Sequence, residues 1–169
     1  AANVALPSPA GVRCVDVETA DQLEAACRAE FPACDVLVMA AAVADFRPAA
    51  PVDDKIKKAG REGLTLELEP TTDVLAAVAA ERRPDQVLVG FAAEHGDGAV
   101  ARAAEKLERK RLDAVVVNDI SRADIGFDST HNEVTIVTAT GTREVPRGPK
   151  AEVARAILDC VEELRARGA

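Results

Sequence analysis

The stretch VLVMAAAV, residues 36–43, decides the fold, because every residue in it is apolar. Such a run is typical of a strand that is buried on both faces, as the strands of parallel sheets are. VLVGFA at 87–92 and AVVV at 114–117 have the same character. Since helical segments separate the three runs, the sequence predicts an open parallel sheet whose strands are joined by right-handed crossovers.

Four helices are predicted around these strands. The first begins at Thr19, where Gln22 completes a capping box, and it ends at Pro32. Thr72 or Asp73 caps the second helix. In chain order, the helices are expected near residues 19–31, 72–82, 99–111 and 151–167.

Other stretches alternate between polar and apolar residues, which favours strands with one wet face. VRCVDV at 12–17 and LTLEL at 64–68 are of this kind, and residues 134–138 and 143–145 flank a Thr140-Gly141 turn as a hairpin. The predicted fold class is therefore α/β: a Rossmann-like three-layer open parallel sheet with an appended antiparallel β-ribbon. All 169 residues are expected to form a single domain.

Composition narrows the possible functions. The formal net charge of −8 argues against a general nucleic-acid binder, which needs a basic face to neutralise phosphates. The longest apolar stretch, residues 36–44, is too short to span a membrane, and residues 1–9 lack the regions of a signal peptide. The four cysteines show no CxxC spacing and the two histidines stand apart, so we expect free, buried thiols, no zinc site and a reducing cytoplasm.

Ligands of open α/β sheets bind at the carboxyl ends of the strands, and unusual residues occur there. AAAVADFRP at 40–48 places small residues, then Asp45 and Arg47, after the first buried run, and a surface Asp–Arg ion pair is the alternative interpretation. Phe91 and Glu94 follow the second buried run. There they can stack on and orient a planar base, unless Phe91 only packs in the core.

Charged stretches supply candidate anion sites in an otherwise acidic chain. KIKK at 55–58 brings three ammonium groups together, which suits either a phosphate site or a solvated basic loop. EPTTDV at 69–74 offers a helix N-terminus, whose hydroxyl and N–H groups either bind an anion or simply cap the helix. Lys106 and Lys110 lie on one face of a predicted helix, which is either a ligand-binding face or an exposed, salt-bridged one.

Glycine-rich phosphate loops are absent from the sequence, which contains neither GxGxxG nor a Walker motif. A nicotinamide-dependent oxidoreductase on the same kind of sheet is therefore disfavoured. A non-catalytic binding or dimerisation module stays open as an alternative, to which the hairpin at 134–145 would contribute. The residues after the third buried run, 118–127, are a further candidate ligand loop.

The chain resembles the CTP-dependent phosphopantothenoylcysteine synthetases of bacteria from Ala2 to its last helix. The resemblance rests on six stretches in this order: AAVADFRP, KIKK, LELEPTTDV, VGFAAE, KLERKRLDAVVVNDIS and IGFDSTHNEVTIV. It implies a phosphopantothenate–cysteine ligase of coenzyme A biosynthesis. In that reaction, CTP activates the 4′-phosphopantothenate carboxylate as an acyl-cytidylate, and the amine of cysteine then displaces CMP.

The resemblance also implies partners and a larger context. The family uses Mg²⁺ with CTP, acts in the cytoplasm, and forms dimers or larger oligomers, so a homodimer is expected, with neither nucleic acid nor membrane as a partner. The family's domain is usually the C-terminal half of a bifunctional protein, and an upstream flavin-dependent decarboxylase domain would hold FMN. It begins with a strand, a Gly-rich turn and a helix, in a region where an Asn steadies the acyl-cytidylate. Residues 1–169 are expected to lack this strand–turn–helix.

Site residues follow from the resemblance position by position. Lys55 is the implied catalytic residue, against the phosphates or the acyl-phosphate bond. Lys106 and Lys110 belong to a segment that acts in the family as a mobile flap over the nucleotide. The implied CTP-binding positions are Met39, Ala40, Ala41, Asp45, Lys55, Thr72, Asp73, Val74, Leu75, Phe91, Lys106 and Lys110.

Recognition of the base and of the metal is less defined. Backbone groups near Ala41 and Phe91 would read the cytosine edge, because fixed N–H and C=O groups discriminate well between bases. Asp45 is the candidate for holding Mg²⁺ through the metal–triphosphate, since Mg²⁺ binds phosphate oxygens with one or two carboxylates.

Overall fold

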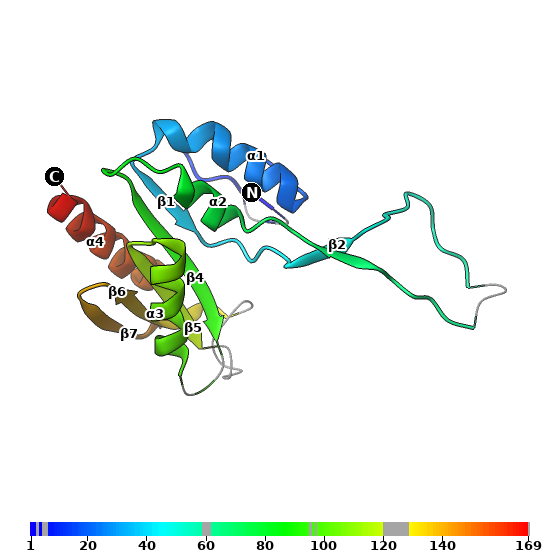
Figure 1. The fold of residues 1–169 in the computed structure, drawn as a ribbon. Coiled ribbons are helices and arrows are strands. Elements are labelled where there is room, and N and C mark those ends of the chain that lie inside the picture. Colours follow the sequence, from blue (N-terminus) through cyan, green and yellow to red (C-terminus); the bar gives the residue numbers. More distant parts are fainter. Residues whose placement is uncertain are drawn as a thin grey trace.

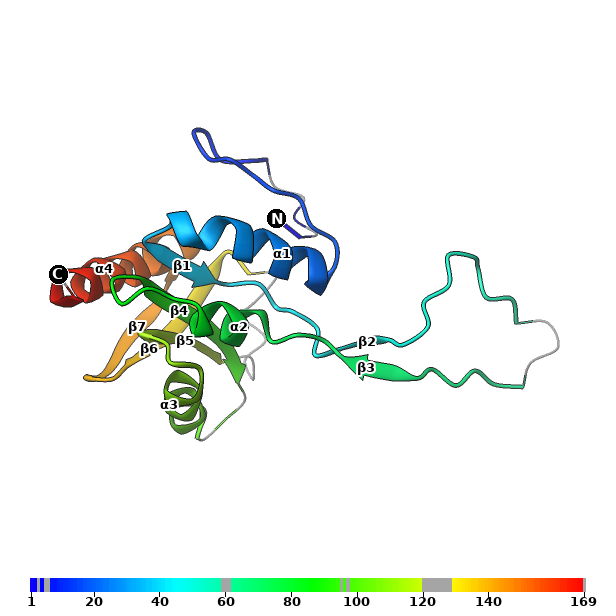
Figure 2. The same cartoon turned by 45° about the horizontal axis from the view of Figure 1, so that its top comes forward.

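A computed structural model describes residues 1–2, 4, 7–58, 62–94, 96, 98–119 and 129–168, which form a body and an arm (Figure 1). The body is a five-stranded mixed sheet with helices on both faces. The arm leaves the body after Asp45 and returns at Thr71, and it projects well beyond the sheet (Figure 2).

The sheet has the strand order β1-β4-β5-β6-β7. The first three strands of this order run parallel, whereas β6 and β7 are antiparallel to their neighbours. The predicted α/β sheet and its antiparallel ribbon are therefore confirmed, and the ribbon continues the main sheet beyond β5. The strands are β1 (Val36–Met39), β4 (Val87–Glu94), β5 (Ala114–Asp119), β6 (His131–Thr138) and β7 (Gly141–Pro149).

Three helices, α1 to α3, cover one face of the sheet, and α4 covers the other (Figure 1). The predicted capping box of α1 is confirmed, because the Gln22 N–H donates to the Thr19 hydroxyl at 3.1 Å and the Gln22 side chain accepts from the Thr19 N–H at 3.2 Å. The helices are α1 (Ala20–Glu30), the short 3-10 helix η1 (Phe31–Ala33), α2 (Val74–Ala80), α3 (Ala99–Lys110) and α4 (Lys150–Gly168).

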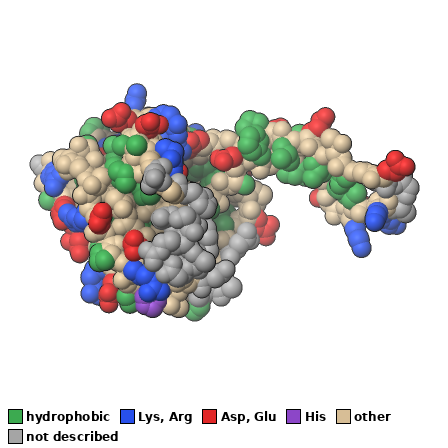
Figure 3. Space-filling model, turned by 90° about the horizontal axis from the view of Figure 1, so that it is seen from below, with side chains coloured by type: hydrophobic (Ala, Val, Ile, Leu, Met, Phe, Trp, Pro, Cys, Tyr) green, Lys and Arg blue, Asp and Glu red, His purple; other side chains and the backbone are tan. Residues whose placement is uncertain are grey.

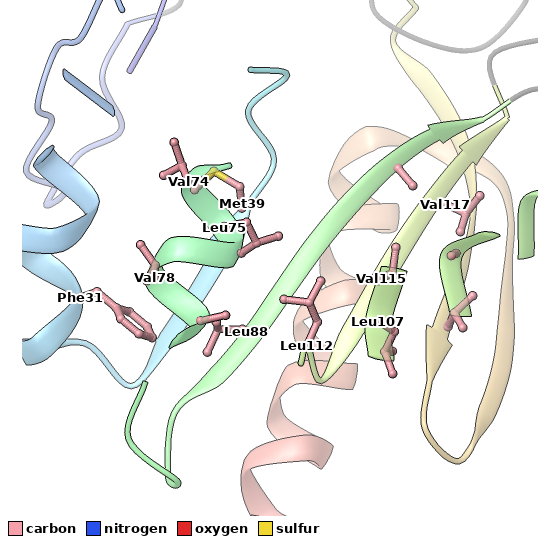
Figure 4. Close-up of a cluster of buried hydrophobic side chains, with 14 residues drawn as sticks. Phe31, Met39, Val74, Leu75, Val78, Leu88, Leu107, Leu112, Val115 and Val117 are labelled. Carbon is pink, nitrogen blue, oxygen red and sulfur yellow. The ribbon is translucent and has the colours of Figure 1, made fainter. Parts of the chain in front are cut away.

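Apolar side chains of the central strands alternate between the two faces. Leu88 and Val115 belong to the cluster beneath α1, α2 and α3 that Figure 4 shows. Val89 and Val116 belong to the second cluster, which packs against α4. All four side chains are at most 1% exposed. The continuous apolar sequence of these strands thus reflects burial on both faces.

The arm begins as a small antiparallel sheet of its own. Its strands are β2 (Phe46–Pro48) and β3 (Leu68–Pro70), and the described residues beyond them, 49–58 and 62–67, form neither helix nor strand. Of the strand predicted at 64–68, only Leu68 is therefore in a strand. The Ala49 N–H still bonds the Glu67 carbonyl at 2.9 Å, just beyond these strands. A two-stranded ribbon without a covering layer buries little apolar surface, which explains why the ribbon stays short.

Two predictions at the open edge of the sheet were wrong. Residues 12–17 form no strand, because β1 is the edge and no strand lies beside them, although the Val17 N–H bonds the Ala1 carbonyl at 2.9 Å. The run 36–43 leaves the sheet early, at Ala40, whose N–H bonds the Val38 carbonyl at 3.2 Å. Val38 is 39% exposed because β1 has a neighbour on one side only.

The cysteines are free, as predicted, but they are not uniformly buried. Cys160 is buried in the body, whereas Cys27 and Cys34 are partly buried. Cys14 is exposed, since it lies in the stretch that fails to join the sheet. In the part of the chain that is described, no helix has the length and apolar character needed to cross a membrane.

Candidate functional site

A cavity of about 240 Å³ lies at the carboxyl ends of β1 and β4, where open α/β sheets bind ligands. One wall is the segment that follows β1, a second is the start of α2, and a third is one face of α3. Together, the lining residues are Met39, Ala41, Ala42, Val43, Ala44, Asp45, Thr71, Thr72, Asp73, Val74, Leu75, Phe91, Lys106 and Lys110.

Most of the implied CTP-binding positions meet in this cavity. Ala40 does not line it, although both of its neighbours, Met39 and Ala41, do. Lys55 lies in the arm stretch 49–58 and does not line the cavity. The remaining implied positions all line it: Met39, Ala41, Asp45, Thr72, Asp73, Val74, Leu75, Phe91, Lys106 and Lys110.

Helix α3 turns two ammonium groups toward the cavity. The Lys106 ammonium donates to the Phe91 carbonyl at 2.7 Å. Lys110, whose side chain is only 14% exposed, forms an ion pair with the Asp73 carboxylate at 2.6 Å. These two lysines are therefore not exposed, although Lys110 is salt-bridged as the alternative interpretation expected. Ammonium groups are suited to hold phosphate oxygens, although the lining also includes the carboxylates of Asp45 and Asp73.

The pKa of Lys106 reflects its burial and its charged neighbours. Burial lowers the pKa of Lys106, and the neighbouring Lys110 ammonium lowers it further, against the opposing effect of Asp73 and Glu94. A bound polyanion would raise this pKa again, since an opposite charge favours the charged form.

Asp73 joins the helix start to the two lysines. Its carboxylate caps α2 by accepting the Ala76 N–H at 3.1 Å, which confirms the predicted cap. Burial by itself would raise the pKa of Asp73, but the hydrogen bonds from Lys110 and Ala76 and the nearby ammonium charges outweigh it and lower the pKa. Asp73 is therefore a carboxylate that orients Lys110 from the opposite wall.

Phe91 both packs in the core and borders the cavity, the two roles that its sequence position left open. It packs against the cluster beneath α4 and is only partly buried, so it contributes to the core. It also lines the cavity, and its carbonyl holds the Lys106 ammonium. Core packing and ligand contact are both compatible with this placement.

The segment that follows β1 is not held by an Asp45–Arg47 ion pair. Arg47 instead donates to Glu69 at 2.8 Å and to the carboxylate of Asp21 in α1, so it fastens the base of the arm to the body. Thr71 holds the segment: its hydroxyl donates to the Ala44 carbonyl at 2.5 Å. Thr71 lies in the EPTTDV stretch that the sequence singled out as a helix N-terminus, but its bond to the segment after β1 was not predicted.

A second, larger cavity of about 640 Å³ adjoins the first. Its lining is mostly apolar and comes from the start of α1, the base of the arm and the segment after β1. Ala41 to Ala44 and Thr71 line both cavities. These residues therefore form a shared wall between a polar, lysine-lined cavity and an apolar one.

The carboxyl end of β5 extends this edge of the sheet. Asn118 accepts a hydrogen bond from the Asn132 side chain at 2.8 Å, which ties β5 to β6. Most of the candidate loop at 118–127 lies outside the described residues. Its expected contribution to ligand binding stays a prediction.

Gly90, in the middle of β4, explains how the cavity floor is packed. A Cβ atom there would lie 2.9 Å from Leu112 Cδ1 and 2.9 Å from Leu75 Cδ2. Gly90→Ala is therefore expected to lower the free energy of unfolding by about 1–3 kcal/mol and, because Leu75 lines the cavity, to weaken ligand binding. Gly63→Ala is the matched control, since its Cβ meets nothing within 4 Å. Chemical unfolding of both variants measures the effect, and equal stability of the two would contradict it.

Fold and site together define an α/β protein with a Rossmann-like sheet and a lysine-lined cavity at its strand ends. The chain belongs to the family described as the DNA/pantothenate metabolism flavoprotein C-terminal domain, whose sequence profile matches residues 1–164.

Relatives of this chain include coenzyme A biosynthesis bifunctional proteins (CoaBC). The chain is 37% identical over 163 residues to the protein from Vibrio cholerae, and 41% identical over 165 residues to the protein from Mycobacterium tuberculosis. It covers 40% and 39% of these relatives, and the matches cover 95% and 92% of this chain. A crystal structure of the C-terminal domain of a CoaBC protein superposes with a TM-score of 0.77 at 32% identity, over 96% of this chain and 71% of that one.

Proposed function

We propose that this chain is a phosphopantothenate–cysteine ligase domain that uses CTP. The 4′-phosphopantothenate carboxylate attacks the α-phosphorus of CTP, which forms an acyl-cytidylate and releases pyrophosphate. The amine of cysteine then attacks the acyl carbon, loses a proton and releases CMP. Family membership and the names of the relatives support a role in coenzyme A biosynthesis. The observation that carries the proposal is the cavity that gathers Lys106, Lys110 and Asp45 at the strand ends.

The chemistry requires two anions to approach each other. Lys106 and Lys110 lower that cost by placing positive charge beside the triphosphate, where water is partly excluded. Release of Lys110 from Asp73 and of Lys106 from the Phe91 carbonyl would make both ammonium groups available. Movement of α3 toward the nucleotide, as a flap, stays part of this proposal.

Magnesium fits the donors around the cavity when the nucleotide supplies the phosphates. Within the described ranges, no group of three or more His, Cys, Asp and Glu side chains is placed to hold a metal ion. A metal bound mainly by phosphate oxygens needs only one or two carboxylates, and Asp45 and Asp73 border the cavity. The ion would supply further positive charge at the triphosphate.

CTP is expected to bind this site well ahead of ATP. Backbone groups near Ala41 and Phe91 border the cavity and would read the edge of the smaller base. Calorimetric titration with Mg²⁺ and CTP, ATP or NAD, on the full-length protein, measures this preference. Equal affinity for CTP and ATP would contradict the specificity, whereas binding of NAD alone would favour an oxidoreductase, and binding of none would favour a non-catalytic module.

A homodimer is part of the proposal because the arm has no covering layer. Apolar side chains along it are largely exposed, and several gather on one side of the arm (Figure 3). A contiguous group of exposed apolar side chains is typical of an interface. A second copy would cover it. The exposed apolar side chains of the arm are Phe46, Val52, Ile56, Leu64, Leu66 and Leu68.

The same dimer would give Lys55 a role. It lies on the exposed part of the arm, which in both views projects away from β4 and α3 (Figures 1 and 2). The cavity of its own chain is lined without it. We therefore propose that Lys55 completes the site of the second copy and contacts the phosphates there.

Further sequence upstream would complete the sheet. Among the described residues, no strand pairs with the outer edge of β1, and an additional strand would pair there. The curated relatives are more than twice as long as this chain and are named as bifunctional. We propose that the native protein carries an upstream strand–turn–helix and, before it, a flavin-dependent decarboxylase domain that holds FMN.

A further inference from the structure

Thr71 marks the point at which the arm returns to the body. Its N–H donates to the Asp45 carbonyl at 2.9 Å, and its hydroxyl donates to the Ala44 carbonyl at 2.5 Å. Two successive carbonyls of one segment are thus held by a single residue of another, and the two segments are far apart in sequence.

These bonds hold together two walls of the lysine-lined cavity. Residues 41–45 form neither helix nor strand, so no regular ladder of hydrogen bonds fixes their path. Thr71 directly precedes the residues that start α2, among them Asp73, which orients Lys110. The position of the loose wall relative to the lysines therefore depends on Thr71.

The same wall also separates the two cavities. Ala41 to Ala44 and Thr71 border the cavity of about 240 Å³ on one side and the cavity of about 640 Å³ on the other. A shift of this wall would change the shape of both cavities at once. In a reaction that joins two bound substrates, such a shift misaligns the reacting atoms.

We propose that Thr71 is a positioning residue, whose hydroxyl holds the wall between the two cavities and so sets the distance between the nucleotide and the carboxylate substrate. This role rests on the proposed ligase function. Thr71 acts through Ala44 and Asp45, and it needs no contact of its own with either substrate.

The test compares three variants of the full-length protein. Thr71→Val keeps the β-branched shape and the backbone N–H but removes the hydroxyl, whereas Thr71→Ser keeps the hydroxyl. Thr138→Val is the matched control, because the Thr138 hydroxyl also donates to a backbone carbonyl, that of Gly141 at 3.1 Å, in the distant β6–β7 turn. Steady-state kinetics with CTP, phosphopantothenate and cysteine, together with thermal unfolding, are measured for each.

Thr71→Val is expected to lower kcat/KM by roughly 10- to 100-fold, through a higher KM for both CTP and phosphopantothenate as well as a lower kcat. Thr71→Ser should recover most of this loss, and Thr138→Val should match the wild type. The unfolding midpoints of the two valine variants should be similar. If Thr71→Val only reduces the folded fraction, or leaves both KM values unchanged, the positioning role is overturned. If the wild type itself makes no product, the proposed function fails instead.

Discussion

Replacing Lys55 by alanine is expected to reduce acyl-cytidylate formation by roughly 100- to 1,000-fold, by analogy with the loss of a group that stabilises charge in a transition state. An ammonium that contacts a reacting phosphate acts where charge develops and water is excluded. A solvated ammonium contributes little, because water already stabilises the same charge. The measurement is pyrophosphate release in the full-length protein with CTP and phosphopantothenate.

Lys58→Ala is the matched control for this prediction. Lys58 belongs to the same KIKK stretch and is also exposed on the arm, so its loss removes the same charge from the same segment. We expect it to change the rate only slightly. Similar, modest losses from both substitutions would show that the stretch is a solvated basic loop and would contradict the role of Lys55.

A mixed dimer of Lys55→Ala and Lys110→Ala subunits is expected to retain about half of the wild-type activity, while each homodimer is nearly inactive. The reason is geometric: Lys110 lines the cavity of its own chain, and Lys55 lies on an arm that points away from it. If Lys55 serves the second copy, one of the two sites in the mixed dimer holds both lysines. The mixed dimer is purified through two different affinity tags, and its CMP release is measured.

The outcome separates the two possible placements of Lys55. If Lys55 acted on its own chain, both sites of the mixed dimer would lack a lysine and the preparation would stay inactive. A dimer in which both subunits carry Lys55→Ala, each with a different tag, controls for the effect of the tags. Failure to recover any mixed dimer would contradict the homodimer itself.

Much of the site could be predicted from the sequence, because its signals are local. The spacing of Lys106 and Lys110 places both on one helix face, and Asp73 caps α2 where the sequence offered a cap. Four of the six stretches that carried the family resemblance contribute residues to one cavity, because the carboxyl ends of parallel strands lie at one edge of a sheet.

Other features depend on contacts between distant segments. The lysine-bearing face of α3 contacts Asp73 and Phe91 rather than solvent. Arg47 forms ion pairs with Glu69 and Asp21 and not with its near neighbour Asp45. Periodicity does not specify which elements lie opposite one another, so each of these pairings had an alternative in the sequence.

The sequence by itself determined the class of sheet, the order of its helices and strands and the family, since apolar runs, caps and motifs are read within a few residues. Only the tertiary structure decided that β1 is an edge strand, that residues 12–17 lie outside the sheet and that the arm carries Lys55 away from its own cavity. It alone revealed Thr71 between two cavities. The physical reason is that strand pairing, cavity walls and ion pairs join segments that are distant in the sequence. Which distant segments meet depends on the tertiary fold.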